Sequence, residues 1–130
     1  MRHASLLGLL ALLAGCAAPA RVEAPVLAGE PVATDVSLLR GEFVAGRQPD
    51  GNTLLLRGRA GLVVFDTGRH AGHVQRIVDA ARTARVPVVA IVNSHWHLDH
   101  VSGNAALRDA YPKADVYASD AIAGAMSPRQ

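Results

Sequence analysis

Short apolar runs alternate with polar turns through the middle of the chain, and their lengths and periods predict β-strands. Residues 53–57 and 62–65 are two such runs, and the stretch 58–61 between them, which begins and ends with glycine, predicts a hairpin. Residues 88–92 form a third run that is apolar throughout, as is typical of a buried strand. Weaker runs predict three further short strands, at 36–39, 42–44 and 114–118.

A helical period follows the hairpin. Apolar residues recur three and four positions apart over about 70–84, which predicts a helix with one buried stripe, formed by Val74, Ile77, Val78 and Ala81. Val86-Pro87 ends this helix, because proline lacks a backbone N–H and disfavours helix in the residue before it. The order strand, helix, strand predicts a right-handed crossover between parallel strands, and therefore an α/β fold.

Two shorter helices and one turn complete the pattern. A helix that ends near Ala110 is predicted to have Ser102 or Asn104 as its N-cap, and another runs from about 119 to 126. The Pro-Asp-Gly sequence within 48–52 predicts a turn, because proline presets φ and Asp-Gly tolerates positive φ.

The densest group of reactive side chains follows the strand 88–92 directly, in the sequence Asn-Ser-His-Trp-His-Leu-Asp-His. Four residues of metal-ligand type fall within six positions: His95, His97, Asp99 and His100. Imidazole nitrogen and carboxylate oxygen bind zinc, iron and manganese. A helix would divide these residues between two faces, whereas an extended segment projects His95 and His97 to the same side. Adjacent Asp99 and His100 then diverge, so a curled loop could present them to a second ion, about 3.5–4 Å from the first.

This motif resembles the His-x-His-x-Asp-His signature of the metallo-β-lactamase superfamily of metallohydrolases. The resemblance implies that residues 36–130 are the N-terminal half of an αββα sandwich, a mixed sheet with flanking helices. It implies that His95 and His97 hold a first metal ion. Asp99 and His100 would hold a second, with Asp99 also orienting the nucleophile and taking part in proton transfer.

The same resemblance implies a cofactor and a reaction. The cofactor would be Zn²⁺, as one ion or two, with iron or manganese as alternatives. The reaction would be hydrolysis, in which water activated by the metal attacks an ester, lactone, lactam or related bond of a small-molecule substrate.

Asp66 begins the sequence Asp-Thr-Gly at the end of the strand 62–65. In the superfamily an aspartate at this place supports the metal loop by hydrogen bonds rather than by binding metal, and the resemblance implies that role for Asp66. Both segments follow strands of an α/β sheet, where ligands usually gather at the carboxyl ends. From the residues alone, a plain turn or a helix cap stays open for Asp66.

His70 and His73 lie three positions apart at the start of the predicted helix, close enough to share a ligand. They could line a substrate mouth or assist the metal site, and the alternative is that both are solvated. We do not count them as metal ligands.

The family pattern is only partly present. The superfamily takes a third histidine for the first metal, a bridging aspartate and a last histidine for the second metal from its other half, and no histidine follows His100 here. Catalytic zinc normally has three protein ligands plus water, so each ion would receive only two ligands. We therefore expect a truncated product of a longer enzyme gene, whose activity alone is open. The rivals are an iron-dependent sulfur dioxygenase of the same fold and a non-catalytic envelope lipoprotein.

The N-terminus predicts export. A short basic start precedes an apolar run at 4–14 that is too short to span a bilayer, as in a signal peptide over residues 1–15. Leu-Ala-Gly-Cys at 13–16 resembles the bacterial lipobox, which implies cleavage before Cys16 and its acylation. Acyl chains on Cys16 and a proline-containing linker over 16–35 would hold the protein at a membrane of the bacterial envelope, facing the periplasm. The alternative is an ordinary secreted protein.

Composition excludes other classes of partner. The net charge is +2, the thirteen basic residues are dispersed, and aromatics make up only 4% of the chain, which argues against nucleic-acid binding. A single cysteine excludes an internal disulfide. A small-molecule substrate remains the expected partner.

Overall fold

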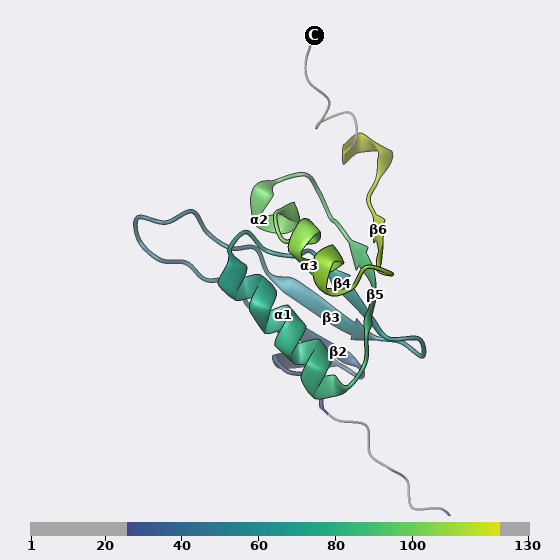
Figure 1. Cartoon of the computed structure of the whole chain (residues 1–130). Coiled ribbons are helices and arrows are strands. Elements are labelled where there is room, and N and C mark those ends of the chain that lie inside the picture. Colours follow the sequence, from purple (N-terminus) through teal and green to yellow (C-terminus); the bar gives the residue numbers. More distant parts are fainter. Residues whose placement is uncertain (1–25, 123–130) are drawn as a thin grey trace, which may run out of the picture.

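The computed structural model describes residues 26–122. The predictions for the signal peptide, for Cys16 and for the end of the last helix fall outside the described residues. Within them the elements are, in chain order, β1 (Glu30–Ala33), β2 (Val36–Leu39), β3 (Thr53–Arg57), β4 (Leu62–Phe65), α1 (Ala71–Ala84), β5 (Val88–Val92), α2 (Leu98–Val101), α3 (Asn104–Ala110) and β6 (Asp115–Tyr117) (Figure 1). Among these helices, none has the length and apolar character that crossing a bilayer requires.

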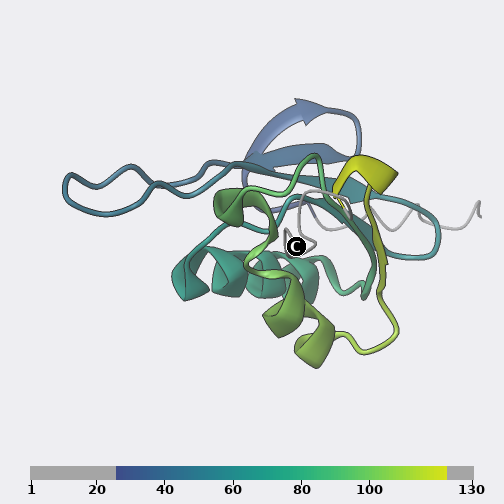
Figure 2. The ribbon, with the colours of Figure 1, turned by 90° about the horizontal axis from the view of Figure 1, so that it is seen from above.

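The six strands form one mixed sheet in the order β1-β2-β3-β4-β5-β6. Neighbours from β1 to β4 pair antiparallel, whereas β4, β5 and β6 pair parallel. Helix α1 connects β4 to β5, and α1 and α3 lie on the same face of the sheet (Figures 1 and 2). The predicted α/β class, the hairpin and the parallel crossover are therefore confirmed.

The core lies between the sheet and the helices α1 and α3. Alternation along the strands turns one set of side chains toward the helices, and Leu55, Val64 and Ile91 are completely buried there. They belong to one apolar cluster with Ile77 of α1 and Leu107 of α3. The predicted stripe of α1 is buried at all four positions, because residues three and four apart share a helix face.

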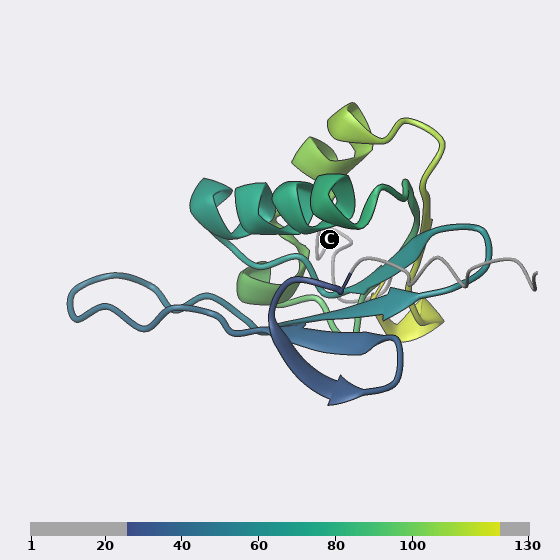
Figure 3. The same cartoon turned by 90° about the horizontal axis from the view of Figure 1, so that it is seen from below.

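The opposite face of the sheet is also apolar. Register pairs Leu54 with Phe65 and Leu56 with Val63 across β3 and β4, and all four side chains are half-buried. Figure 3 shows α1 and α3 together on the other side of these strands.

The predicted linker is wrong at its C-terminal end. Residues Glu30–Ala33 form β1, which pairs with β2 across a turn in which Asp35 has a φ of 58°. Pro31 favoured a linker because proline cannot donate to a strand ladder. However, β1 is an edge strand, where a missing N–H is tolerated.

A long loop over residues 40–52 replaces two predicted features (Figures 2 and 3). The expected strand at 42–44 is wrong, because Phe43 is 83% exposed and the Glu42 carbonyl accepts from the Asp50 N–H within the loop itself. The tight turn lies at 44–47, where the Arg47 N–H donates to the Val44 carbonyl at 3.0 Å, and not at 48–52.

The chain after β5 differs from the prediction in two details. The second half of the histidine motif is a single helical turn, α2, and the N-cap of α3 is Gly103 without a side-chain cap. Ser102 and Asn104 are therefore wrong as N-caps, and the Asn104 amide pairs instead with Asn93, at 2.7 Å. Residues 120–122 begin a helical turn, and the rest of that predicted helix lies outside the described residues.

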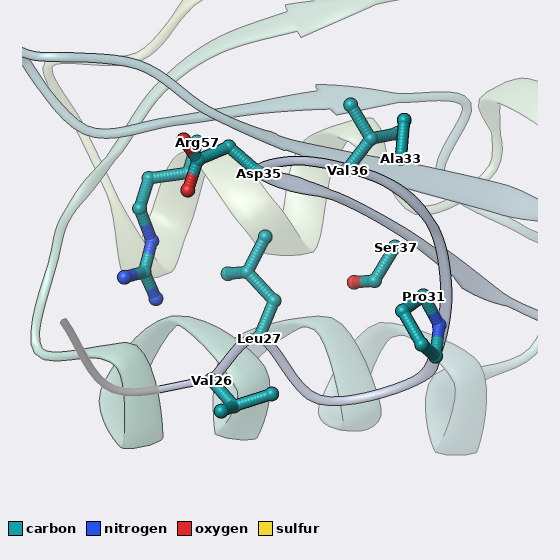
Figure 4. A pocket seen from close by; sticks show the side chains of 8 residues that line it. All are labelled: Val26, Leu27, Pro31, Ala33, Asp35, Val36, Ser37 and Arg57. Atoms are coloured by element: carbon teal, nitrogen blue, oxygen red, sulfur yellow. The ribbon is translucent and has the colours of Figure 1, made fainter. Parts of the chain in front are cut away.

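A cavity of about 220 Å³ lies between the N-terminal segment and the strands β1 to β3 (Figure 4). Leu27 lies at its centre, with Asp35 and Arg57 at one side. None of the predicted site residues lines this cavity, so the candidate site is elsewhere.

The core assignment predicts a difference between neighbouring leucines of β3. We expect Leu55→Ala to lower the free energy of unfolding by about 2–5 kcal/mol, because it empties a completely buried position. Leu54→Ala, on the half-buried face, should cost clearly less. Urea denaturation followed by circular dichroism measures both, and equal losses would contradict the assignment.

Candidate metal centre

The candidate centre lies where β4 and β5 end side by side. Phe65 and Val92 are register partners in the parallel pair, and the Asp66 N–H donates to the Val92 carbonyl at 2.8 Å. Asp66 and the loop that carries the histidines therefore leave the sheet at the same edge, as parallel strands require.

The buried carboxylate of Asp66 accepts the hydrogen bonds that join the two strand ends. Its side chain is held by three donors: Ser94 N–H to Oδ1 at 2.8 Å, Ser94 hydroxyl to Oδ2 at 2.6 Å and His100 Nδ1 to Oδ2 at 2.7 Å. The residue is only 4% exposed, and these bonds compensate the loss of hydration of its carboxylate. Its φ of 61° is uncommon for a residue with a side chain, although aspartate is among those that tolerate it best.

These bonds fix which ring nitrogens carry protons. An ionised carboxylate only accepts, so His100 donates from Nδ1 and the Ser94 hydroxyl donates its single proton to Asp66. Ser94 Oγ lies 2.9 Å from His95 Nδ1 and must then accept from that nitrogen. In their neutral forms, His95 and His100 then have an unprotonated Nε2, the state in which imidazole binds metal.

The three imidazoles of the motif form one cluster. The ring centroid of His95 is 4.6 Å from that of His97 and 4.0 Å from that of His100. The His95 and His97 rings lie together as predicted, but the backbone bends over residues 94–96, so the extended segment predicted for that part of the motif is wrong.

Asp99 joins the cluster through His100. Its Oδ2 lies 3.3 Å from His100 Nε2, which is about the separation of two ligands that share one tetrahedral ion at 2.0–2.1 Å. The donor chemistry and this spacing fit zinc for the pair Asp99 and His100. Within residues 26–122, however, no three His, Cys, Asp or Glu side chains are placed to hold one ion.

Hydrogen bonds from Thr67 and Asn93 hold the backbone of the motif at His100. The His100 carbonyl accepts from the Thr67 N–H at 2.9 Å and from the Asn93 amide at 3.2 Å. Asn104 holds Asn93 in turn. Sequence reasoning assigned no site role to Ser94, Asn93 or Asn104, and the only signal was the position of Ser94 and Asn93 next to the motif.

The loop over 40–52 touches the centre through Gly51. Its N–H donates to the Asp99 carbonyl at 3.0 Å, and a Cβ at this position would lie 2.3 Å from the same oxygen. The glycine that suggested a turn is therefore required for close approach of two backbones. Beside it, Asp50 Oδ1 accepts from the backbone N–H groups of Arg69 and His70.

His70 and His73 are not brought into the cluster. His70 is half-buried, and its Nε2 lies 2.8 Å from the Gln48 carbonyl oxygen. His73 is 2% exposed and lies in the interior rather than at a surface opening, so the solvated alternative is wrong for it. The side chain fits there because Gly68, with a φ of 72°, leaves room for the ring; a Cβ would lie 2.5 Å from it.

His73 supports Asp66 from the other side. The Thr53 hydroxyl donates to the Asp66 carbonyl at 2.9 Å and lies 2.7 Å from His73 Nε2, so it accepts from that nitrogen. The Nδ1 atom of His73 is buried and has no hydrogen-bond partner among the described residues. Burial lowers the pKa of His73 below 6.5, and the nearby Asp50 carboxylate opposes this only in part.

The chain matches the model of one known protein family. The family model described as the metallo-beta-lactamase superfamily matches residues 46–125, more than half of the 130 residues. No curated protein matches the chain.

Several solved structures share the fold. A metallo-β-lactamase from Hirschia baltica is 22% identical with a TM-score of 0.62, and the match covers 74% of this chain and 44% of that one. The DIM-1 metallo-β-lactamase is 22% identical with a TM-score of 0.62, over 80% and 47%. FIM-1 from Pseudomonas aeruginosa, in its mono-zinc form, is 20% identical with a TM-score of 0.59, over 77% and 47%. These likenesses show the fold, and the chain spans less than half the length of the structures it matches.

The role of the Asp66 carboxylate predicts a loss of stability on removing its charge. We expect Asp66→Asn to lower the free energy of unfolding by about 1.5–3 kcal/mol, because hydrogen bonds to a charged group are lost. Asparagine also tolerates positive φ, so the backbone preference is kept. The matched control, Asp99→Asn, should cost less than about 1 kcal/mol. Equal losses in urea denaturation would contradict the role.

The buried His73 predicts a pH dependence of stability. Because burial lowers its pKa in the folded chain, the unfolded chain takes up the proton first as pH falls below about 6.5. The free energy of unfolding should therefore fall from pH 6.5 downward, and His73 should contribute no slope above that range. Denaturation from pH 4.5 to 8 should show a weaker slope for His73→Gln, and an unchanged slope would refute the assignment.

Proposed function

The chain belongs to the metallo-β-lactamase superfamily, and from this premise we propose that it carries part of the active site of a metal-dependent hydrolase. The proposed ligands are His95 and His97 for one ion, and Asp99 and His100 for a second. The proposed metal is zinc. The proposed substrate is a small molecule with an ester, lactone, lactam or related bond.

One observation carries the proposal. The buried Asp66 accepts from His100 directly and is linked to His95 through Ser94, so that the neutral form of each ring has a free Nε2 for metal. Metal-binding histidines commonly donate their other ring nitrogen to a carboxylate, which fixes the tautomer and the ring orientation. A solvated loop with incidental histidines would not need such a support.

The residues of the chain have distinct proposed roles. A bound zinc ion would lower the pKa of a water molecule to about 7 and polarise the substrate bond. Asp99, whose carboxylate lies 3.3 Å from His100 Nε2, is the group we propose to orient the nucleophile and to move a proton. Asp66 and Ser94 hold the rings still, and they are positioning residues.

The proposed activity belongs to a larger fold than the one described. The chain spans 44% to 47% of the length of the Hirschia baltica, DIM-1 and FIM-1 structures. Catalytic zinc usually has three protein ligands, and each proposed pair supplies two. We propose that the remaining ligands come from the other half of the fold, and that the pairs present in this chain bind metal.

Metal titration of the 130-residue chain tests the proposal. We expect near-stoichiometric zinc after dialysis against a small excess. His97→Ala should lower zinc affinity by at least about tenfold, because losing an outer-shell partner alone costs 10–100-fold. His70→Ala, which removes a histidine outside the cluster, should leave the affinity unchanged. Absence of zinc from the wild-type chain, or equal zinc in both variants, would contradict the site.

Hydrolysis is measured on the same samples. Nitrocefin, a γ-lactone and an aryl ester cover the proposed bond types. Cleavage by the zinc-loaded chain above the rate of the His97→Ala chain would support the reaction. Cleavage above the buffer rate that is equal in both chains would exclude these ligands from the reaction.

A further inference from the structure

The three imidazoles of the cluster are supported in different ways. Ser94 orients His95 and Asp66 orients His100, each through a hydrogen bond at Nδ1. The His97 ring makes no hydrogen bond with any described residue, and it is exposed. Its ring contacts are with His95 and with Trp96.

Trp96 meets His97 edge to face. The ring centroids are 4.6 Å apart and the planes cross at 79°, an arrangement that aromatic pairs prefer because the positive edge of one ring faces the negative face of the other. The described residues give Trp96 no other aromatic contact.

Core packing does not explain this tryptophan. Trp96 is 47% exposed, and it is not part of the apolar cluster between the sheet and the helices. Its large side chain is left half in water beside the one imidazole of the motif that lacks a hydrogen-bonded support.

We propose that Trp96 is a positioning residue for His97, in which an aromatic edge contact replaces the missing hydrogen bond. The inference rests on the proposed function, because His97 needs a fixed orientation only as a ligand. By restricting rotation of the imidazole before metal arrives, the indole reduces the ordering that binding requires. The proposal concerns the ring contact, so another aromatic residue should replace Trp96 and an aliphatic one should not.

Titration of the full chain with Co²⁺ alone tests this, with affinity and the visible d–d absorption of the bound ion as readouts. We expect Trp96→Ala and Trp96→Leu to weaken Co²⁺ binding by about 2- to 10-fold, the range expected from the worth of an aromatic pair. Trp96→Phe should stay within about twofold of the wild type. Urea denaturation should give similar stabilities, since half of the side chain is in water.

A second readout uses the wild-type chain only. Trp96 is the single tryptophan of the sequence, so fluorescence reports on this residue alone. Binding of Co²⁺ should quench the emission strongly, because the indole contacts a proposed ligand, whereas diamagnetic Zn²⁺ should not.

The outcomes separate the inference from the function it rests on. A wild-type chain that binds no Co²⁺ would overturn both. A wild-type chain that binds Co²⁺ as tightly as Trp96→Leu does would overturn the positioning role and leave the metal site standing. Trp96→Phe as weak as Trp96→Leu, or unquenched fluorescence on Co²⁺ binding, would also overturn the role.

Discussion

The buried carboxylate of Asp66 is the interaction on which the rest of the centre depends. It lies 4% exposed at the carboxyl end of β4 and accepts three hydrogen bonds from the segment that follows β5. Removing such a group from water is costly unless its donors are in place. The fold meets this cost by pairing β4 and β5 in parallel, which brings the donors of the second strand end to the first.

The support of Asp66 extends into the core. The hydroxyl of Thr53 on β3 donates a hydrogen bond to the Asp66 carbonyl, and it accepts one from Nε2 of the buried His73 on α1. The imidazole cluster is thereby connected through short hydrogen bonds to the elements that form the apolar core. A change in packing that displaces His73 would therefore also displace Thr53 and Asp66, which hold the metal loop.

Local pattern predicted much of the fold, and contacts between distant residues account for what it missed. The bounds of β3, β4 and β5 follow from runs of apolar residues, and α1 follows from its period of three and four. Pro31 led to the wrong prediction of a linker, because only the order of strands in the sheet shows that β1 is an edge strand, where proline is tolerated. Gly51 led to the wrong prediction of a turn at 48–52. Its actual role is a close approach to Asp99, 48 residues later, which neighbouring residues in the sequence do not reveal. The four proposed ligands stood out by spacing alone, whereas Ser94 acquires its role only when β4 and β5 are paired.

The central claim is that one carboxylate sets the proton positions of two imidazoles. Long-range ¹H–¹⁵N correlation spectra of the metal-free chain, at a pH where the imidazoles are neutral, measure this most directly. The predicted result is that His95 and His100 both carry their proton on Nδ1 and leave Nε2 bare, and that both lose this preference in Asp66→Asn. A proton on Nε2 of either ring in the wild-type chain, or tautomers unchanged by that substitution, would contradict the account.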